Sequence, residues 1–324
     1  LSAREYIDGV LSGDRVLLAR AITLVESNAP AHQEVAQEVL TAILPERCAS
    51  TRVGITGVPG AGKSTLIETL GCGLTASGHK VAVTAVDPSS SLTGGSILGD
   101  KTRMEKLAAD PNAFIRPSPT GGTLGGVARK TRETIMLFEA AGYDVILVET
   151  VGVGQSEVQV RSMVDFFLLV LLAGAGDDLQ GIKKGVVEIA DAILVNKADG
   201  ANLAAARTAR SEFERVIHYL RPATEGWTTQ ALLSSAATGE GVMDLWAGVE
   251  EFAELTRGNG VFDRRRSEQE KLWVAALVRE GLEDLFYTHP GVSEQMAALE
   301  QQVARGEVPA TAAARKLLDL FRKG

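Results

Sequence analysis

A glycine-rich segment, residues 57–64, carries the residue types that bind a polyphosphate. It reads Gly57, Val58, Pro59, Gly60, Ala61, Gly62, Lys63 and Ser64, which fits G-x-x-x-x-G-K-[ST] at every fixed position. Glycines let the backbone wrap closely, so that several N–H groups point inward at phosphate oxygens. Lys63 would reach the β- and γ-phosphates, and the Ser64 hydroxyl would take one position around Mg²⁺. The segment therefore predicts a nucleoside triphosphate site.

A second motif, Asn196-Lys197-Ala198-Asp199, indicates which base this site reads. Guanine presents two adjacent donors, N1–H and the 2-amino group, and one ionised Asp199 can accept both. Adenine would leave this carboxylate facing a lone pair, so the pattern favours GTP and GDP over adenine nucleotides. Asn196 can help to fix the base edge, and the stem of Lys197 can lie over the ring. Further along, Ser234-Ser235-Ala236 resembles a backbone loop that meets guanine O6.

The γ-phosphate side is predicted to lie at Glu149-Thr150-Val151-Gly152, where many GTPases have D-x-x-G. The Gly152 N–H can bind the γ-phosphate, and Glu149 can hold Mg²⁺ through water or orient the attacking water. Val153 stands where Ras-like enzymes place a water-orienting glutamine. We therefore expect slow intrinsic GTP hydrolysis that a partner accelerates.

Two further acids are candidate Mg²⁺ ligands. Asp87 ends the strand that follows the first helix of this region, and Asp100 lies in a polar stretch. Each also has an ordinary use as a turn residue or a helix cap. The segment 177–184 mixes both charges, which suits a switch that contacts a partner, with a solvated helix start as the alternative reading.

Short apolar runs alternating with helical stretches must position these motifs. Strands are predicted at 52–56, 80–86, 113–116, 144–149, 166–172, 191–196 and 231–234. Most of these runs are continuously apolar, as expected for strands buried on both faces of a parallel sheet. The glycine-rich segment follows the first strand and opens a helix predicted over 63–77. The fold class predicted is α/β: a doubly wound, mostly parallel sheet with helical N-terminal and C-terminal extensions.

Helical patterns flank this region and suggest three parts: an N-terminal helical extension (1–50), a nucleotide-binding domain (51–256) and a C-terminal helical arm (257–324). Residues 14–26 and 35–43 space apolar side chains as helices do, and Pro45 ends the second. The arm carries an apolar stripe made of Leu272, Ala276, Leu282, Leu285 and Phe286. Such a stripe predicts dimerisation, with packing on its own domain as the alternative.

Composition excludes several other classes. The chain has 324 residues, with 33 Lys plus Arg against 41 Asp plus Glu, a formal charge of −8. This balance argues against a general nucleic-acid or anionic-membrane surface. The longest apolar run, residues 166–173, is far short of a membrane span. The only two cysteines, Cys48 and Cys72, show no disulfide or zinc spacing. We therefore expect a cytoplasmic protein, in the bacterial cytosol or, with a transit peptide removed, in the mitochondrial matrix.

Together the motifs resemble those of the methylmalonyl-CoA mutase-associated GTPases of the MeaB/ArgK type. These motifs are G-V-P-G-A-G-K-S-T, V-D-P-S-S, G-G-S-I-L-G-D-K-T-R-M, E-T-V-G-V-G-Q-S-E, Q-G-I-K-K-G and N-K-A-D, in this order. The resemblance implies a homodimeric GTPase, related to the metallochaperone GTPases, that gates adenosylcobalamin loading onto an acyl-CoA mutase and protects that enzyme. By this resemblance, phosphate, Mg²⁺ and base contacts fall on Gly57 to Thr65, Asp87, Asp100, Glu149, Gly152 and Asn196 to Asp199. A partner-sensing switch falls on 177–188.

Two other functions stay open at this point. A metallochaperone GTPase would share the fold and slow hydrolysis, but such proteins usually need Cys/His metal ligands, and the sequence has no C-x-C, C-x-x-C or His-rich tract. A transport-linked kinase would need a second substrate pocket, and N-K-x-D disfavours ATP as its phosphate donor.

Overall fold

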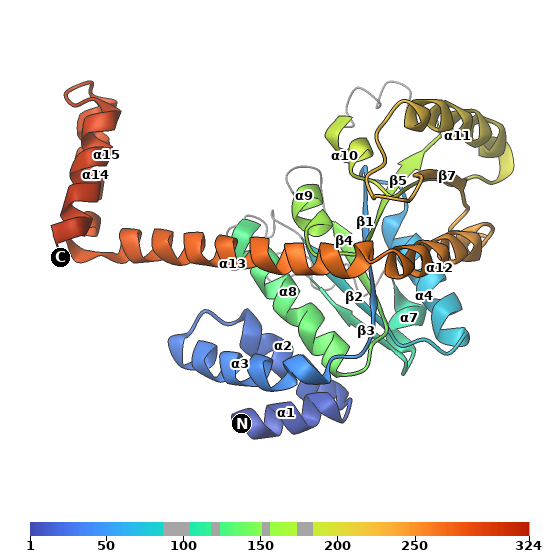
Figure 1. Cartoon of the computed structure of the whole chain (residues 1–324), viewed down its shortest axis with the longest axis horizontal. Helices are drawn as coiled ribbons and strands as arrows, with labels where there is room; N and C mark the ends of the chain where they lie inside the picture. Colours follow the sequence, from blue (N-terminus) through green and yellow to red (C-terminus); the bar gives the residue numbers. More distant parts are fainter. Residues whose placement is uncertain (87–103, 118–123, 151–155, 174–183, 324) are drawn as a thin grey trace. The chain divides into compact units, whose positions relative to one another are not determined.

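The computed structural model describes residues 1–86, 104–117, 124–150, 156–173 and 184–323. These residues form two compact units, Leu1–Ser267 and Glu268–Gly324. Seven strands of the described residues build one sheet in the first unit, with the order β3-β2-β4-β1-β5-β6-β7 (Figure 1). Every neighbouring pair in this sheet is parallel.

The strands fall where the apolar runs predict them, within one or two residues at each end. Their bounds are Thr51–Gly57 (β1), Val81–Val86 (β2), Ala113–Arg116 (β3), Val145–Thr150 (β4), Phe166–Leu172 (β5), Ala192–Asn196 (β6) and Gln230–Leu233 (β7). Successive side chains of a strand point to opposite faces, and here both faces are buried. On β4, Val145 and Leu147 enter one core while Ile146 and Val148 enter the other. This confirms a doubly wound α/β fold.

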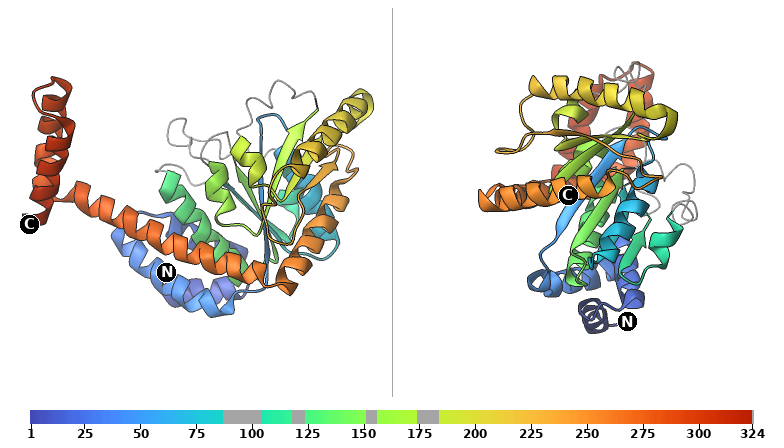
Figure 2. Two further views of the ribbon diagram at one scale, coloured as in Figure 1. Left: turned by 45° about the horizontal axis from the view of Figure 1, so that its top comes forward. Right: turned by 90° about the vertical axis from the view of Figure 1, so that its right-hand side faces the viewer.

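Helices cover the two faces of the sheet (Figures 1 and 2). On one face, the apolar core includes side chains from α4 (Lys63–Ala76), α7 (Glu105–Ala109) and α12 (Val242–Gly258). The opposite core includes side chains from α8 (Leu124–Ala140), α9 (Ser156–Arg161), α10 (Lys184–Glu188) and α11 (Leu203–His218). A short 3₁₀ turn, η2 (Gly200–Asn202), leads into α11. The sheet is thus a buried middle layer, which leaves its strand ends as the places where ligands can reach it.

Three N-terminal helices extend the second core. They are α1 (Ala3–Leu11), α2 (Arg15–Glu26) and α3 (Pro30–Ile43), the last followed by the 3₁₀ turn η1 (Leu44–Glu46) at Pro45. The buried side chains of Leu18, Ile22 and Val39 share the apolar cluster of Phe138 on α8. The helix patterns at 14–26 and 35–43 predicted α2 and α3, but α1 was missed. Its start is nonetheless encoded, because Ser2 and Glu5 form a capping box.

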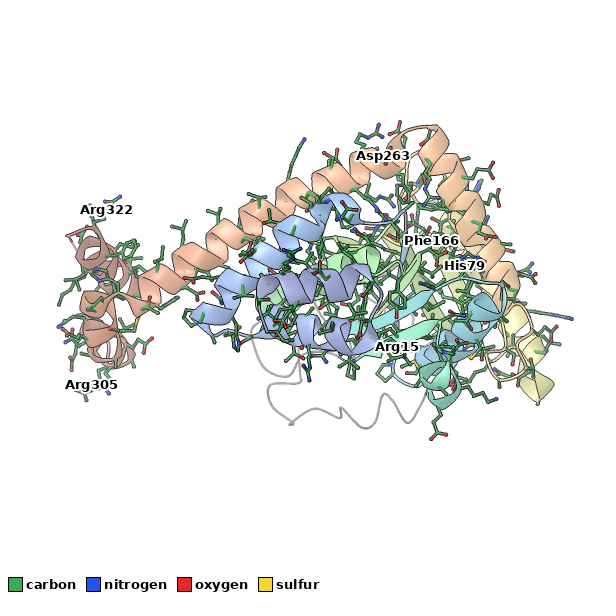
Figure 3. The ribbon with its side chains drawn as sticks, turned by 90° about the horizontal axis from the view of Figure 1, so that it is seen from below. Arg15, His79, Phe166, Asp263, Arg305 and Arg322 are labelled. Atoms are coloured by element: carbon green, nitrogen blue, oxygen red, sulfur yellow. The ribbon has the colours of Figure 1, made fainter. Side chains whose placement is uncertain are left out.

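Arg15 ties these N-terminal helices to the rest of the first unit. Its guanidinium Nη1 donates to the carbonyl oxygens of Pro111 and Ala113, at 2.8 Å and 2.6 Å (Figure 3). The same guanidinium lies 5.7 Å from the centre of the Phe114 ring. At the far end of α2, Glu26 accepts two hydrogen bonds from Arg116 at the end of β3. The helices therefore pack as part of the first unit.

An arginine–carboxylate cluster lies at the amino-terminal edge of the sheet. Arg266 forms two hydrogen bonds to Asp165, which directly precedes β5, at 2.8 Å and 2.6 Å. The backbone N–H of Arg52 on β1 also donates to Asp165, while the Arg52 side chain pairs with buried Glu139 at 2.7 Å. Burial alone would lower the pKa of Arg266, but the hydrogen bond and charge of Asp165 outweigh it and raise that pKa. The cluster fixes the first turns of α13 (Val261–Thr288) to β1 and β5.

The second unit contains the rest of α13 together with a helical hairpin. The hairpin consists of α14 (Pro290–Ala304) and α15 (Ala310–Lys323), with a small core of Val292, Leu299, Ala313 and Leu317. In α13, the side chains of Leu272, Val278, Leu282 and Leu285 are each more than half exposed. The boundaries of the three parts predicted from the sequence stay a prediction. No helix among the described residues combines the length and apolar character needed to cross a membrane.

Candidate functional site

The glycine-rich segment lies at the carboxyl end of the central strand β1. Strands β2, β3 and β4 lie on one side of β1, and β5, β6 and β7 on the other. In parallel α/β sheets, ligands bind in the crevice at the carboxyl ends of strands where the order reverses. The segment leaves β1 at Gly57 and enters α4 at Lys63. The fold therefore presents this loop, and the first turn of α4, at the place where a ligand can bind.

Two glycines of the loop occupy positions that no other residue fits. Gly57 has a φ of 151°, and a Cβ atom there would lie 2.0 Å from the carbonyl oxygen of Val170 on β5. Gly62, which begins α4 with a φ of 86°, would place a Cβ atom 2.7 Å from the Nδ2 atom of Asn196. Positive φ is accessible to glycine at little cost. The glycines let the loop approach β5 and β6 closely enough to form one continuous site.

Lys63, Ser64 and Glu149 form the phosphate end of the site. The Lys63 ammonium donates to the Gly57 carbonyl at 2.9 Å, and the Ser64 hydroxyl donates to Glu149 Oε1 at 3.1 Å. Glu149 is buried on β4, next to Ile55 of β1 in the sheet register. Burial lowers the pKa of Lys63, and the negative charge of Glu149 offsets this only in part. A polyphosphate would add further negative charge beside this partly desolvated ammonium.

The oxygen atoms at this end suit Mg²⁺, which prefers hard oxygen ligands. A hydroxyl and a carboxylate already lie within hydrogen-bonding distance of each other, beside the loop that would hold the phosphates. Among the residues that the structure describes, no group of three or more His, Cys, Asp or Glu side chains is arranged to hold a metal. Three predicted residues, Asp87, Asp100 and Gly152, lie outside the described residues. Strand β2 ends at Val86, in register with Thr150 of β4.

Asn196 joins the phosphate end to the predicted base end. From the end of β6, its Nδ2 donates to the Ala61 carbonyl at 2.8 Å. Its Oδ1 accepts from the backbone N–H of Ala236 at 3.0 Å and from the Ser234 hydroxyl at 3.3 Å. The side chain is only 1% exposed, so these contacts are shielded from water. Asn196 thus bonds both to the loop of residues 57–64 and to the loop of Ser234 and Ala236, while its role at the base edge stays a prediction.

The base end brings Asp199, Ser235 and Ala236 together. The Ser235 hydroxyl donates to Asp199 Oδ2, and the backbone N–H of Ala198 donates to the Ser234 carbonyl at 2.9 Å. Among the described residues, Lys197 is the only non-glycine residue with a positive φ, 58°. Its carbonyl accepts from Asn202 Nδ2 at 2.8 Å, which holds this turn. Asp199 is thereby presented next to the loop of Ser235 and Ala236, as reading guanine would require.

One residue at the site was not predicted. Thr69 lies in the second turn of α4, and its hydroxyl donates to the Ala236 carbonyl at 2.8 Å. The partners are separated by 167 positions in the sequence. A threonine within a helix is an unremarkable residue, so no local pattern marks it.

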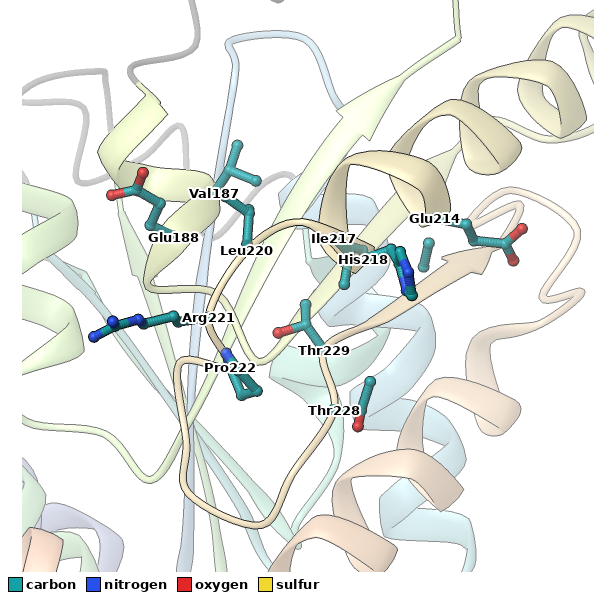
Figure 4. Close-up of a pocket in the computed structure, with 11 residues that line it drawn as sticks. Val187, Glu188, Glu214, Ile217, His218, Leu220, Arg221, Pro222, Thr228 and Thr229 are labelled. Atoms are coloured by element: carbon teal, nitrogen blue, oxygen red, sulfur yellow. The ribbon is translucent and has the colours of Figure 1, made fainter.

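A separate pocket of about 390 Å³ lies elsewhere on the first unit (Figure 4). Val187 and Glu188 of α10 line it together with Ile217 and His218 of α11 and Thr229 next to β7. None of the predicted nucleotide-binding residues is among those that line it. Val187 and Glu188 belong to the segment 177–188, on which the resemblance places a partner-sensing switch, and residues 177–183 of that segment lie outside the described residues.

The fold and the site define a class of protein. A parallel sheet places G-x-x-x-x-G-K-S after its central strand and N-K-x-D two strands away, beside a loop that meets the base end. This is the arrangement of a P-loop GTPase. Residues 18–291 match the family described as methylmalonyl Co-A mutase-associated GTPase MeaB. The chain belongs to this family, and it is a GTPase.

Individual relatives agree with this assignment. A protein of Caulobacter vibrioides named as a GTPase is 54% identical over 312 residues, which cover 96% of this chain and 95% of that protein. The mouse protein named methylmalonic aciduria type A homolog, mitochondrial, is 45% identical over 324 residues, covering 97% and 78% of the two chains. Among solved structures, one titled LAO/AO transport system kinase superposes with a TM-score of 0.78 at 36% identity. That superposition covers 99% of this chain and 97% of the other.

Proposed function

We propose that this GTPase serves an adenosylcobalamin-dependent acyl-CoA mutase, with methylmalonyl-CoA mutase as the first candidate. In this proposal, it gates the loading of the cofactor onto the mutase and protects the enzyme from inactivation. The family match over residues 18–291 is the observation that carries the proposal, because the family is described by its association with that mutase. The mouse relative, named for methylmalonic aciduria, supports the same partner.

GTP would bind along the carboxyl edge of the sheet, with its phosphates in the loop of residues 57–64. Lys63 would turn from the Gly57 carbonyl to the β- and γ-phosphates, which relieves the unfavourable burial of its charge. Backbone N–H groups of the loop, including those of Gly60 and Ala61 after Pro59, and that of Thr65 in α4, would surround the phosphates. The guanine would lie between Lys197 and the loop of Ser235 and Ala236, with Asp199 accepting from N1–H and the 2-amino group.

The Ser64 hydroxyl and the Glu149 carboxylate would hold Mg²⁺, with Glu149 binding it directly or through water. When bound, the ion neutralises charge on the β- and γ-phosphates as the terminal bond breaks. Asp87 and Asp100 complete the proposed set of Mg²⁺ ligands, and the Gly152 N–H would bind the γ-phosphate. Glu149 already accepts the Ser64 hydrogen bond at 3.1 Å, so the chain itself holds the two ligands close to each other.

Hydrolysis is proposed to be slow until the partner binds. Attack on the γ-phosphate needs a water molecule held in line with the bond that breaks, and Val153 offers no polar group for this. The partner, or a loop that the partner orders, would supply the missing orientation. The exposed apolar side chains of α13 support a homodimer as the form that acts on the mutase. We place the protein in the bacterial cytosol or, in an organelle-targeted form, in the mitochondrial matrix.

A second candidate has one observation in its favour. The solved relative at 36% identity carries a title that names a transport system kinase. A kinase would pass the γ-phosphate to a second substrate, whereas a GTPase passes it to water. Hydrolysis of γ-labelled GTP with the label recovered only as inorganic phosphate would favour the mutase-directed GTPase, and label transferred to a protein would favour the kinase.

Steady-state GTP hydrolysis tests the proposal directly. The rate is measured with the purified chain alone and then with a titrated acyl-CoA mutase, in its apo and cofactor-loaded forms. We expect the chain alone to hydrolyse GTP slowly. At saturating mutase the rate should rise by about tenfold or more, as it does when a partner completes the catalytic site of a GTPase. If neither form of any mutase tested changes the rate of GTP hydrolysis, the proposed mutase partner is wrong, although the protein remains a GTPase.

A further inference from the structure

Ala236 is held by hydrogen bonds from two elements that are far apart in the sequence. Its backbone N–H donates to Asn196 Oδ1 on β6, at 3.0 Å, and its carbonyl accepts from the Thr69 hydroxyl on α4, at 2.8 Å. Asn196 also donates to Ala61, which lies two residues before α4 begins. These contacts close a hydrogen-bonded ring of Ala61, Asn196, Ala236 and Thr69 through the first turns of α4.

We propose that Thr69 is a positioning residue for guanine recognition: it holds Ala236 so that the Ala236 N–H, which donates to Asn196 Oδ1 in this structure, can be shared with the O6 edge of the base. This inference rests on the guanine site proposed above and adds to it a residue that does not touch the nucleotide. Without the Thr69 hydroxyl, Ala236 would be held from the β6 side only. The N–H would then spend less time in the position where a base oxygen can accept from it.

The surroundings of Thr69 leave its hydroxyl as the specific link between α4 and the base loop. The loop closes on itself through Gly239 N–H to the Ser235 carbonyl, at 2.8 Å, and Ser235 N–H to the Glu240 carbonyl, at 2.9 Å. A Cβ atom placed on Gly239 would lie 3.8 Å from the Thr69 methyl group, so the methyl group is close enough to pack on the loop. The methyl group thus supplies packing, whereas only the hydroxyl sets the direction of the Ala236 carbonyl.

The role predicts an effect on one edge of the base and not on the other. The O6 edge would be read by the Ala236 N–H, and the 2-amino group by Asp199. GDP compared with 6-thio-GDP reports on the first contact, because sulfur is a weak acceptor. GDP compared with inosine diphosphate, which lacks the 2-amino group, reports on the second. A merely structural defect would weaken all three nucleotides alike and leave both ratios unchanged.

The experiment measures dissociation constants of these three nucleotides, and of ADP, by competition. Thr69→Val keeps the branched shape and removes the hydroxyl, and Thr69→Ser keeps the hydroxyl. Thr75→Val is the matched control, because the Thr75 hydroxyl donates within α4 to the Cys72 carbonyl, at 3.1 Å. We expect Thr69→Val to shrink the preference for GDP over 6-thio-GDP by about 3- to 10-fold, the effect of one hydrogen bond. The preference for GDP over inosine diphosphate should change less than twofold, and Thr69→Ser and Thr75→Val should resemble the wild type.

Several outcomes overturn the inference. Unchanged ratios in Thr69→Val, equal changes in both ratios, or a Thr69→Ser variant that behaves like Thr69→Val would each do so. Equal affinities of the wild type for GDP and 6-thio-GDP would also overturn the inference, but they would not contradict the assignment as a GTPase. A wild type that binds ADP as tightly as GDP would instead overturn the proposed guanine site. If Thr69→Val does not fold, Thr69→Ala gives the same comparison.

Discussion

The side-chain amide of Asn196 donates a hydrogen bond to the backbone carbonyl of Ala61, 2.8 Å away, across 135 positions of sequence. This bond ties the loop that would hold the phosphates to the end of β6, where the predicted base-reading residues begin. Because both atoms are buried, the bond is protected from competition with water. A nucleotide that spans the two ends would therefore meet a site whose ends are already joined.

Asn196→Ala should weaken GDP binding by about 10- to 100-fold, because it leaves the Ala61 carbonyl and the Ala236 N–H without their buried partner. Titration calorimetry gives the affinity. Asn259→Ala is the control, since its side chain accepts from the Val261 N–H at the start of α13, away from the predicted nucleotide-binding residues. Equal losses in the two variants would show that Asn196 has no special place in the site.

Asp199→Asn should shift the preference from GTP towards XTP. Xanthine has a carbonyl where guanine has its 2-amino group, and an amide can donate to it where a carboxylate cannot. We expect GTP affinity to fall by about 100-fold or more and XTP to become the better substrate. Turnover with both nucleotides measures this, and a variant that still prefers GTP would contradict the assignment of Asp199 to the base.

Lys63→Met should abolish most GTP turnover and yet stabilise the nucleotide-free protein at pH 7. Burial lowers the folded-state pKa of Lys63 below its ordinary value of 10.5, so the unfolded chain binds the proton more tightly. The resulting penalty is fully present below the folded-state pKa and is relieved as the pH rises towards 10.5. The melting temperature of the variant should therefore exceed that of the wild type at pH 7 by more than at pH 10.

A melting-temperature difference that is constant with pH would contradict this account of Lys63. Turnover is followed in parallel as phosphate release. A rate close to that of the wild type would mean that the loop of residues 57–64 is not the catalytic site.

Arg266→Ala should lower the free energy of unfolding by about 3 kcal/mol, because it leaves the buried Asp165 carboxylate without its bidentate partner. Arg264→Ala, two residues earlier on the same helix, is the matched control. Arg264 pairs with Glu225, and both side chains are more than half exposed, so its loss should cost about 0.5 kcal/mol. Urea denaturation distinguishes the two, and similar midpoints for both variants would refute the importance of the cluster.

Local pattern was enough to predict the sheet. The seven apolar runs gave the strands because a buried parallel strand must be apolar on both faces, which a sequence shows directly. The loop of residues 57–64 could also be predicted, because its backbone conformation and close contacts require glycine at Gly57 and Gly62. Ser64 and Glu149 were both predicted as Mg²⁺ ligands, and the structure brings them within 3.1 Å of each other.

What the sequence did not show depends on contacts between distant segments. Helix α1 is the exception, because it was missed although its capping box of Ser2 and Glu5 is a local signal. Thr69 and Ala236 carry no pattern that pairs them, and Arg266 looked like one of three charged residues in a row. Arg266 pairs with Asp165 because α13 begins at the amino-terminal edge of the sheet, where Asp165 precedes β5.

The cluster at Asp165 and the loop at Gly57 lie at opposite ends of the strands that connect them. Strand β5 alone has 7 residues, a span of roughly 23 Å at about 3.3 Å per residue. The proposed phosphate site and the start of α13 are thus separated by the length of the central strands. A fluorophore or a surface tether attached near Glu225 or Arg264 should therefore report on, or restrain, the root of α13 while leaving nucleotide turnover undisturbed. Labels at the amino-terminal edge of the sheet should thus be compatible with nucleotide turnover at the carboxyl edge.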